Sequence, residues 1–224
     1  MNIQSLIDKL FRRDPKMKPN LCYSQNGEDL ILNRLLENKE KGFFIDVGAH
    51  HPIRFSNTYL FYKKGWSGIN IDAMPGSMIK FNKIRPKDIN IECGVGLKND
   101  QLTFYQFNET ALNTFSKKEA LSKNKDGYKI IKSNFLQVES LENLLDKYMP
   151  RNTKIDFLNI DVEGMDLKIL SQLIPNKLHP QLISVETHNV DGSKSNECDK
   201  IHELLKNSNY KLYKRIGPTT LYTI

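Results

Sequence analysis

The chain alternates short apolar runs with longer segments in which apolar residues recur at the spacing of a helix. Such an alternation of strands and amphipathic helices is typical of a parallel sheet covered on both faces. The apolar runs predict strands at 43–48, 66–71, 89–92, 155–160 and 182–185. Helical spacing predicts helices over 24–41, 57–64, 75–83, 140–148, 165–173 and 197–207. The pattern therefore predicts a doubly wound α/β fold.

The two ends of the chain add to this core. Two strands around the turn Gly217-Pro218 predict a C-terminal antiparallel hairpin, which brings the mostly parallel sheet to seven strands. Residues 2–11 have the pattern of a short helix, and a Pro-containing break follows at 14–20. We therefore divide the chain into an N-terminal helical appendage, 1–22, and one domain, 23–224. The appendage is a candidate surface for a second copy of the chain, as in a homo-oligomer.

The middle of the chain is less regular. Residues 102–107 alternate like a strand at the margin of the sheet, whereas 108–134 are the least periodic part of the chain. Six lysines with hardly an apolar anchor lie between Lys117 and Lys132, which is typical of a solvated loop. An irregular stretch of that length in a compact domain is usually functional. We expect the loop 108–134 to close over a bound substrate.

Net charge raises the question of a polyanionic partner. The chain has 33 Lys and Arg against 26 Asp and Glu, a formal net charge of +7. The lysines are scattered, however, and few arginines are available for bidentate recognition of bases or phosphates. We therefore do not expect nucleic acid as the partner, although the charge suits an anionic substrate.

The cellular compartment follows from what the sequence lacks. There is no run of about 18 apolar residues, and the first residues carry charge where a signal peptide is apolar. The three cysteines, Cys22, Cys93 and Cys198, are widely separated and form no C-x-x-C motif. We therefore interpret them as reduced thiols. We expect a cytoplasmic protein without a membrane span.

Polar residues collect where the predicted strands end, which is where doubly wound sheets bind ligands. Asp72 closes the second strand, where a carboxylate holds the hydroxyls of a ribose in such folds. The turn after the first strand offers one glycine, Gly48, and Pro52 stands where a phosphate-binding helix needs free N–H groups. A cofactor with a ribose but no phosphate fits this turn better than a dinucleotide, and S-adenosylmethionine is the leading example.

Five motifs occur in order along the chain: Tyr23 to Asp29, Phe44 to His50, Ser56 to Thr58, Gly65 to Asp72, and Asp156 to Gly164. With these motifs, the chain resembles the FkbM-type family of S-adenosylmethionine-dependent methyltransferases from about Tyr23 to Leu170. The resemblance implies a Rossmann-like methyltransferase fold and methyl transfer to oxygen, often on sugar or polyketide hydroxyls. The pair His50-His51 followed by Pro52 is unusual for the family.

The resemblance also implies which residues surround the cofactor. Asp72 would hold the ribose, the stretch from Glu92 to Gly94 would flank the adenine, and Asp161 would lie near the methionine end. The complete set expected at the cofactor is Gln25, Glu28, Asp46, Gly48, His50, Asn57, Thr58, Asp72, Ala73, Glu92, Cys93, Gly94 and Asp161. We expect Asp46 and Asp72 to converge on one pocket.

An alcohol acceptor needs a base to take its proton or a metal ion to lower its pKa. The candidates for catalysis are His51, Asp161, Glu163, Glu186 and His188. In one arrangement, His51 or His188 is the general base and Glu186 orients it. In the other, Asp161, Glu186 and His188 bind a divalent metal ion, with His51 or Glu163 as a further ligand. We favour the metal, because carboxylates and a histidine come from neighbouring strands.

For the acceptor, we expect a sugar hydroxyl on a nucleotide-activated sugar or a surface-polysaccharide precursor. The alternative is an RNA-binding protein or an RNA methyltransferase that uses the basic surface. A nucleotide-dependent oxidoreductase is disfavoured, because its phosphate-binding glycines are missing. A further alternative is a scaffold or binding protein that keeps the cofactor-binding fold but catalyses no reaction.

Overall fold

A computed structural model describes residues 21–36, 39–125, 127–174, 178–189 and 191–224. The helix predicted at 2–11, and most of the predicted appendage, lie outside the described residues. Cys22, Cys93 and Cys198 are all free thiols. In the described part of the chain, helices are too short or too polar to cross a bilayer.

Seven strands form the main sheet, in the order β3-β2-β1-β7-β8-β10-β9. They are β1 (Phe43–Val47), β2 (Ser67–Asp72), β3 (Ile89–Glu92), β7 (Phe157–Ile160), β8 (Leu182–Glu186), β9 (Lys211–Ile216) and β10 (Thr219–Thr223). Only β10 pairs antiparallel with its neighbours, β8 and β9. The order reverses between β1 and β7, which pair in parallel. The predicted doubly wound, mostly parallel seven-stranded sheet with a C-terminal hairpin is thus confirmed.

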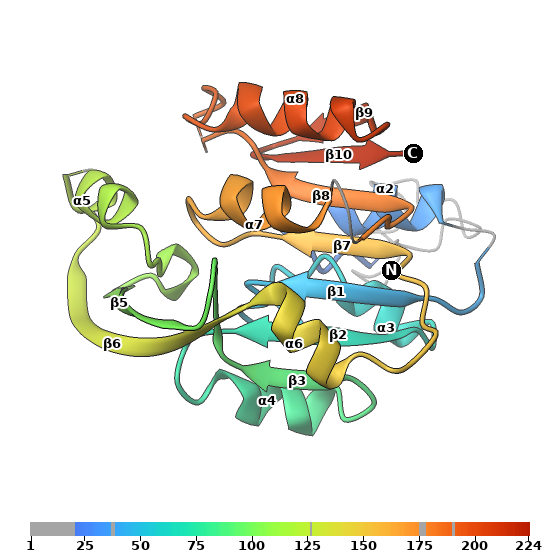
Figure 1. The fold of residues 1–224 in the computed structure, drawn as a ribbon, viewed down its shortest axis with the longest axis horizontal. Helices are drawn as coiled ribbons and strands as arrows, with labels where there is room; N and C mark the ends of the chain where they lie inside the picture. Colours follow the sequence, from blue (N-terminus) through green and yellow to red (C-terminus); the bar gives the residue numbers. More distant parts are fainter. Residues whose placement is uncertain (1–20, 37–38, 126, 175–177, 190) are drawn as a thin grey trace, which may run out of the picture.

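Helices cover both faces of this sheet (Figure 1). They are α2 (Glu28–Leu35), α3 (Tyr59–Lys63), α4 (Ser77–Ile84), α6 (Leu141–Tyr148), α7 (Asp166–Leu173) and α8 (Cys198–Asn207). The side chains of β1 alternate between two cores: Phe43, Ile45 and Val47 pack with α6, α7 and α8. Phe44 points to the opposite face, where α2 and α3 pack. Both faces of β1 are buried, so apolar residues occupy successive positions of the strand, with Asp46 as its one polar residue.

A second sheet of three strands, in the order β4-β6-β5, lies beside the edge at which the parallel strands end (Figure 1). Its strands are β4 (Gly94–Gly96), β5 (Asp100–Phe107) and β6 (Ile130–Ser140). A 3₁₀-helix, η1 (Thr110–Leu112), and helix α5 (Lys117–Lys125) connect β5 to β6. We call the segment 100–140 the lobe.

Two predictions for residues 102–134 are wrong. The strand at 102–107 belongs to the small sheet and not to the margin of the main sheet. Residues 108–134 are not a solvated loop, because they contain η1, α5 and the first half of β6. The reason is that β6 is stabilised by pairing along β5, from Asp100 to Phe107, while its Lys132 side chain stays exposed.

Candidate active site

A cavity of about 300 Å³ lies where the sheet order reverses, at the carboxyl ends of β1, β2 and β7. The sheet contributes Val47, Gly48, Ile71, Asp72, Ala73, Cys93, Asp161 and Glu163. The lobe contributes Phe104, Thr110, Ala111, Asn113, Thr114 and Phe115 from the other side. Doubly wound sheets bind their ligands at this position. The lobe therefore lies against the expected ligand site, but it does so as strands and helices and not as an irregular loop.

Gly48 fixes the turn after β1 against the end of β7. Its φ is 81°, and a Cβ at this position would lie 1.8 Å from the carbonyl oxygen of Asp161. The Gly48 amide donates to the carbonyl of Ile71, at 2.9 Å. Only glycine combines this conformation with so close an approach. The ends of β1, β2 and β7 are thereby locked together around the cavity.

Asp72, the last residue of β2, is half-buried and lines the cavity. Its Oδ2 accepts the amide of His50 at 2.9 Å, and its Oδ1 accepts the amide of Met74 at 2.8 Å. Burial raises the pKa of this carboxyl, while the two backbone hydrogen bonds act in the opposite direction. Each oxygen keeps a further lone pair for a ligand.

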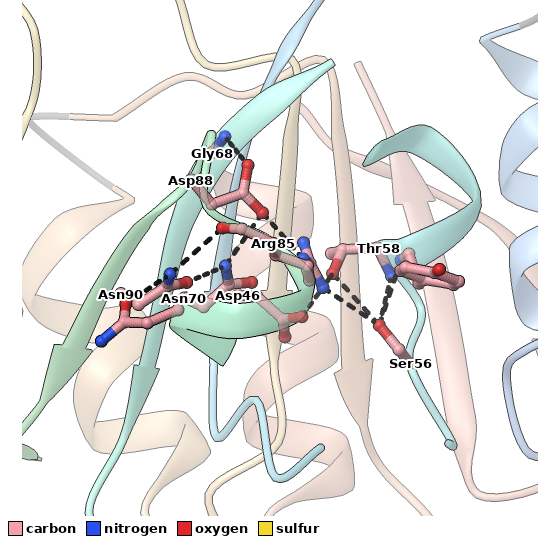
Figure 2. Close-up of polar contacts among 10 residues, drawn as sticks. Asp46, Ser56, Thr58, Gly68, Asn70, Arg85, Asp88 and Asn90 are labelled. Atoms are coloured by element: carbon pink, nitrogen blue, oxygen red, sulfur yellow. Dashed lines mark hydrogen bonds and ion pairs between the residues drawn. The ribbon is translucent and has the colours of Figure 1, made fainter. Parts of the chain in front are cut away.

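Asp46 does not point to the cavity, which corrects the prediction that it meets Asp72 there. It lies on the Phe44 side of β1, buried in the polar network of Figure 2. Thr58 Oγ1 donates to its Oδ2 at 2.6 Å, and Asn159 Nδ2 donates to its Oδ1 at 2.8 Å. Arg85 donates to Thr58 at 3.0 Å. Asp46 and Thr58, which the resemblance implied as cofactor-binding residues, therefore direct their hydrogen bonds to this network.

Arg85 is the buried centre of this network, although no motif or spacing in the sequence indicated it. Its side chain is fully buried, and its Nε donates to Asp88 Oδ2 at 2.7 Å. The guanidinium also lies over the rings of Phe44, Tyr62 and Phe81. Arg85 thus connects Asp88 with Ser56 and Thr58 inside one buried polar network (Figure 2).

Other predicted cofactor residues also lie away from the cavity. Asn57 donates to Asn159 at 3.0 Å, and Glu28 accepts the amide of Asn26 at 2.8 Å. Gln25 is exposed just before α2. Glu92 and Gly94 line an adjoining cavity of about 280 Å³, which shares Ala73 and Cys93 with the first. Of the predicted cofactor set, the residues in the main cavity are Gly48, His50, Asp72, Ala73, Cys93 and Asp161.

Three carboxylates meet at the end of the cavity. Asp161, Glu163 and Glu186 each offer an oxygen, and these oxygens lie within 4.8 Å of one another. They come together because β7 and β8 are neighbouring parallel strands. Loss of water and the charge of Glu163 raise the pKa of Asp161 well above its usual value, although Asp161 keeps solvent contact through the cavity. Burial and the charge of Asp161 raise the pKa of Glu186 likewise.

Glu163 differs from the other two carboxylates, because Lys123 of α5 forms an ion pair with it. Burial raises the pKa of Glu163, and Lys123 partly offsets that effect. Thr114 Oγ1 also donates to the carbonyl oxygen of Glu163, at 2.7 Å. Glu163 has a φ of 54°, a conformation that the contacts from the lobe help to hold. The lobe is thus fastened to the loop after β7, through a lysine expected in a solvated loop.

Asp166, another residue that the sequence analysis missed, shapes the same loop. Its Oδ1 accepts the amide of Val162 and its Oδ2 accepts that of Gly164, each at 3.2 Å. Burial raises the pKa of Asp166 to about 7. An acid in the first turn of a helix was the only sequence signal for this role.

His188 does not join the three carboxylates, which corrects the predicted metal set of Asp161, Glu186 and His188. Its Nδ1 is hydrogen-bonded to Thr187 Oγ1, at 2.8 Å. The amides of Thr187 and His188 both donate to the carbonyl of Pro218, at 3.0 and 3.1 Å. The chain therefore turns directly after Glu186. Among the described residues, Glu163 takes the third place instead.

His50 and His51 both line the cavity. His51 Nδ1 accepts the amides of Ile53 and Arg54, at 3.1 and 3.0 Å. A ring nitrogen that accepts two N–H groups carries no proton, so the proton of the neutral ring lies on Nε2. His51 therefore offers a donor to the cavity, which disfavours the prediction that it acts as general base.

Comparison with known proteins gives limited structural likeness. A TehB-like S-adenosylmethionine-dependent methyltransferase from Corynebacterium glutamicum is 7% identical with a TM-score of 0.42, over 99% of this chain and 97% of that one. The small RNA methyltransferase HEN1 is 12% identical with a TM-score of 0.40, over 93% of this chain and 27% of that one. No curated protein matches the chain.

The family comparison is more informative. The model of the methyltransferase FkbM domain matches residues 46–212, which is well over half of the chain. The matched region contains the turn at Gly48, the end of β2 at Asp72 and the three carboxylates. The chain therefore belongs to the FkbM family of S-adenosylmethionine-dependent methyltransferases.

Proposed function

We propose that the protein is an O-methyltransferase that uses S-adenosylmethionine to methylate a sugar hydroxyl. The acceptor is a nucleotide-activated sugar or a surface-polysaccharide precursor. The observation that carries this proposal is the cavity itself, which has the carboxylate of Asp72 at the end of β2 and that of Asp161 at the end of β7. One carboxylate suits the donor, and the other suits the acceptor.

The residues of the cavity fit the methyl donor. The free lone pairs of Asp72 accept the two ribose hydroxyls, and Ala73, Met74 and Cys93 give the adenine a mostly apolar wall. The missing side chain of Gly48 leaves the turn after β1 close to the ligand. When bound, S-adenosylmethionine supplies a methyl carbon activated by its sulfonium. These residues hold that carbon in line with the acceptor oxygen, which is a large part of catalysis in such a displacement.

Asp161 is the group that we propose as general base for the acceptor hydroxyl. Asp161 lines the cavity, whereas Glu163 is paired with Lys123 and Glu186 is not among the residues that line the cavity. A general base contributes about 10²–10⁴-fold to the rate. Glu186 then acts through Asp161, because a second negative charge within 4.8 Å makes the Asp161 carboxylate more basic.

The three carboxylates also support a second candidate, a catalytic divalent cation. Their oxygens lie within 4.8 Å of one another, and an all-oxygen set suits Mg²⁺ or Mn²⁺. Such an ion would activate the hydroxyl as a Lewis acid. Activity that is lost after EDTA treatment and restored by added Mg²⁺ supports this candidate. Full activity after EDTA treatment leaves Asp161 as base.

The test is incubation with labelled S-adenosylmethionine and a panel of nucleotide-activated sugars, followed by mass detection of a methyl gain. We expect Asp161→Asn to lower kcat by about 10²–10⁴-fold and to leave the affinity for S-adenosylhomocysteine nearly unchanged. We expect Asp72→Asn to weaken that affinity about tenfold. Asp199→Asn is the control, because this carboxylate is exposed and is not among the residues that line the cavity.

Two results contradict the proposal. If S-adenosylhomocysteine neither binds nor stabilises the protein, the cavity does not hold this donor. If methyl groups appear on RNA and on no sugar, the RNA alternative is correct. That alternative also predicts that RNA binding weakens steeply as the salt concentration rises.

A further inference from the structure

Basic groups line the cavity beside Asp72, at a different strand end from the cluster of Asp161, Glu163 and Glu186. His50 and His51 come from the turn after β1, and Lys80 comes from α4. Arg54 is in the same turn as the two histidines. The basic side adjoins Asp72, because the His50 amide donates to Asp72 and α4 follows Asp72 in the chain. The carboxylates of Asp161, Glu163 and Glu186 lie instead at the ends of β7 and β8.

His51 is a preorganised hydrogen-bond donor on this side. The amides of Ile53 and Arg54 hold its Nδ1 in place, so its Nε2–H is free to donate without further ordering of the ring. Pro52 lacks an N–H group, and the two residues after it provide the amides that cap His51.

Lys80 adds an unpaired positive charge next to this donor. It is exposed, lines the cavity and has no ion-pair partner among the residues that the structure describes. Arg54 Nη2 lies 3.4 Å from Glu109 Oε1. Both side chains are about half exposed, so this ion pair is weak. Burial lowers the pKa of both His50 and His51, and the charges of Lys80 and Arg54 lower it further, while the charge of Glu109 acts in the opposite direction at His50. The positive potentials therefore overlap at the two rings.

We infer that His51 and Lys80 form a subsite for a phosphoryl or pyrophosphoryl group of the acceptor. This inference rests on the proposed function and deepens it, because it requires the methylated sugar to carry a phosphate. The Nε2–H of His51 and the ammonium of Lys80 donate charge-assisted hydrogen bonds to the oxyanion. The acceptor is then held by its phosphate on the side of Asp72, while its hydroxyl reaches toward Asp161.

S-adenosylmethionine carries an oxyanion of its own, the carboxylate of its methionine part. The basic side adjoins Asp72, which we place at the ribose, and the methionine part is placed at Asp161. In the proposed arrangement, the group at Lys80 is therefore the phosphate of the acceptor and not this carboxylate. The experiment separates the two sources of the oxyanion.

Pyrophosphate is titrated calorimetrically into the protein saturated with S-adenosylhomocysteine, at constant ionic strength. The variants are Lys80→Ala and His51→Asn, since asparagine can still accept the backbone amides but lacks the distal donor. Lys83→Ala is the matched control, because Lys83 is an exposed lysine of α4 outside the cavity lining. We expect pyrophosphate affinity to fall about tenfold in Lys80→Ala and His51→Asn and to stay unchanged in Lys83→Ala. Affinity for S-adenosylhomocysteine should change by less than about twofold in all three.

Equal pyrophosphate affinity in the wild type and in Lys80→Ala, or no binding to the wild type, overturns the inference. It is also overturned if S-adenosylhomocysteine displaces pyrophosphate and binds Lys80→Ala about tenfold more weakly, since the subsite then holds the donor carboxylate. Because Lys80 is exposed, its variant tests the idea even if His51→Asn does not fold. If S-adenosylhomocysteine fails to bind the wild type, the proposed function fails, and pyrophosphate titration of the free protein still tests the subsite.

Discussion

Substitution of Gly48 by alanine tests whether the contact between the β1 turn and the end of β7 shapes the site. The new Cβ would lie 1.8 Å from the carbonyl oxygen of Asp161, and real Cβ contacts stay beyond 3.0 Å. One of the two segments must therefore move by at least 1.2 Å, which is 3.0 minus 1.8. Misplacement of about 1 Å can cost about 10²-fold in rate. We expect a similar loss of methyl transfer, together with weaker binding of S-adenosylhomocysteine.

Gly65→Ala is the matched control. Gly65 has a φ of 95°, close to the 81° of Gly48, but a Cβ there meets nothing within 4 Å. Both variants pay about 1–2 kcal/mol for a left-handed alanine. In a domain of this size, that strain lowers Tm by about 2–8 °C. Calorimetry should show this decrease alone for Gly65→Ala and a larger one for Gly48→Ala. Equal Tm and equal activity of the two variants would refute the reasoning.

Three further variants test the surroundings of the site. Arg85→Leu leaves the buried carboxylate of Asp88 without its partner, so urea unfolding should show a loss of about 3–5 kcal/mol. Asp166→Asn should reduce the pH dependence of stability. The folded-state pKa of about 7 exceeds the unfolded value of 3.8, so the free energy of unfolding falls as pH rises between these values. Lys123→Ala removes the ion pair with Glu163, so hydrogen exchange in α5 should become faster.

Each of these three predictions has a result that would contradict it. For Arg85→Leu, a loss below about 0.5 kcal/mol, as expected for a surface change such as Lys87→Leu, would mean that the buried pair contributes little. For Asp166→Asn, an unchanged slope of stability between pH 5 and pH 8 would show that Asp166 does not titrate in that range. For Lys123→Ala, unchanged exchange in α5 would show that other contacts hold the lobe.

The framework of the site was predictable because it depends on local pattern. Buried parallel strands are short apolar runs, and the residues that follow them lie at one edge of the sheet. Gly48, Asp72 and Asp161 were found in this way, and the structure places all three in the cavity. The meeting of Asp161 with Glu186 followed from the pairing of consecutive parallel strands.

Side-chain direction was not predictable at Asp46. Both faces of β1 are buried, so its sequence does not indicate which core each residue joins. Only the packing of Arg85 and Thr58 against the Phe44 side settles where Asp46 points. A turn held by Pro218, far along the chain, likewise turns His188 away from Glu186.

The sequence by itself determined the order of strands and helices, the family and the edge of the sheet at which ligands bind, because these follow from local periodicity and motifs. The tertiary structure decided which polar groups share that edge. Strand β6 forms through pairing with distant β5, and this pairing brings Lys123 to Glu163. Such contacts join residues far apart in the chain, and their free energy depends on packing that no local pattern encodes.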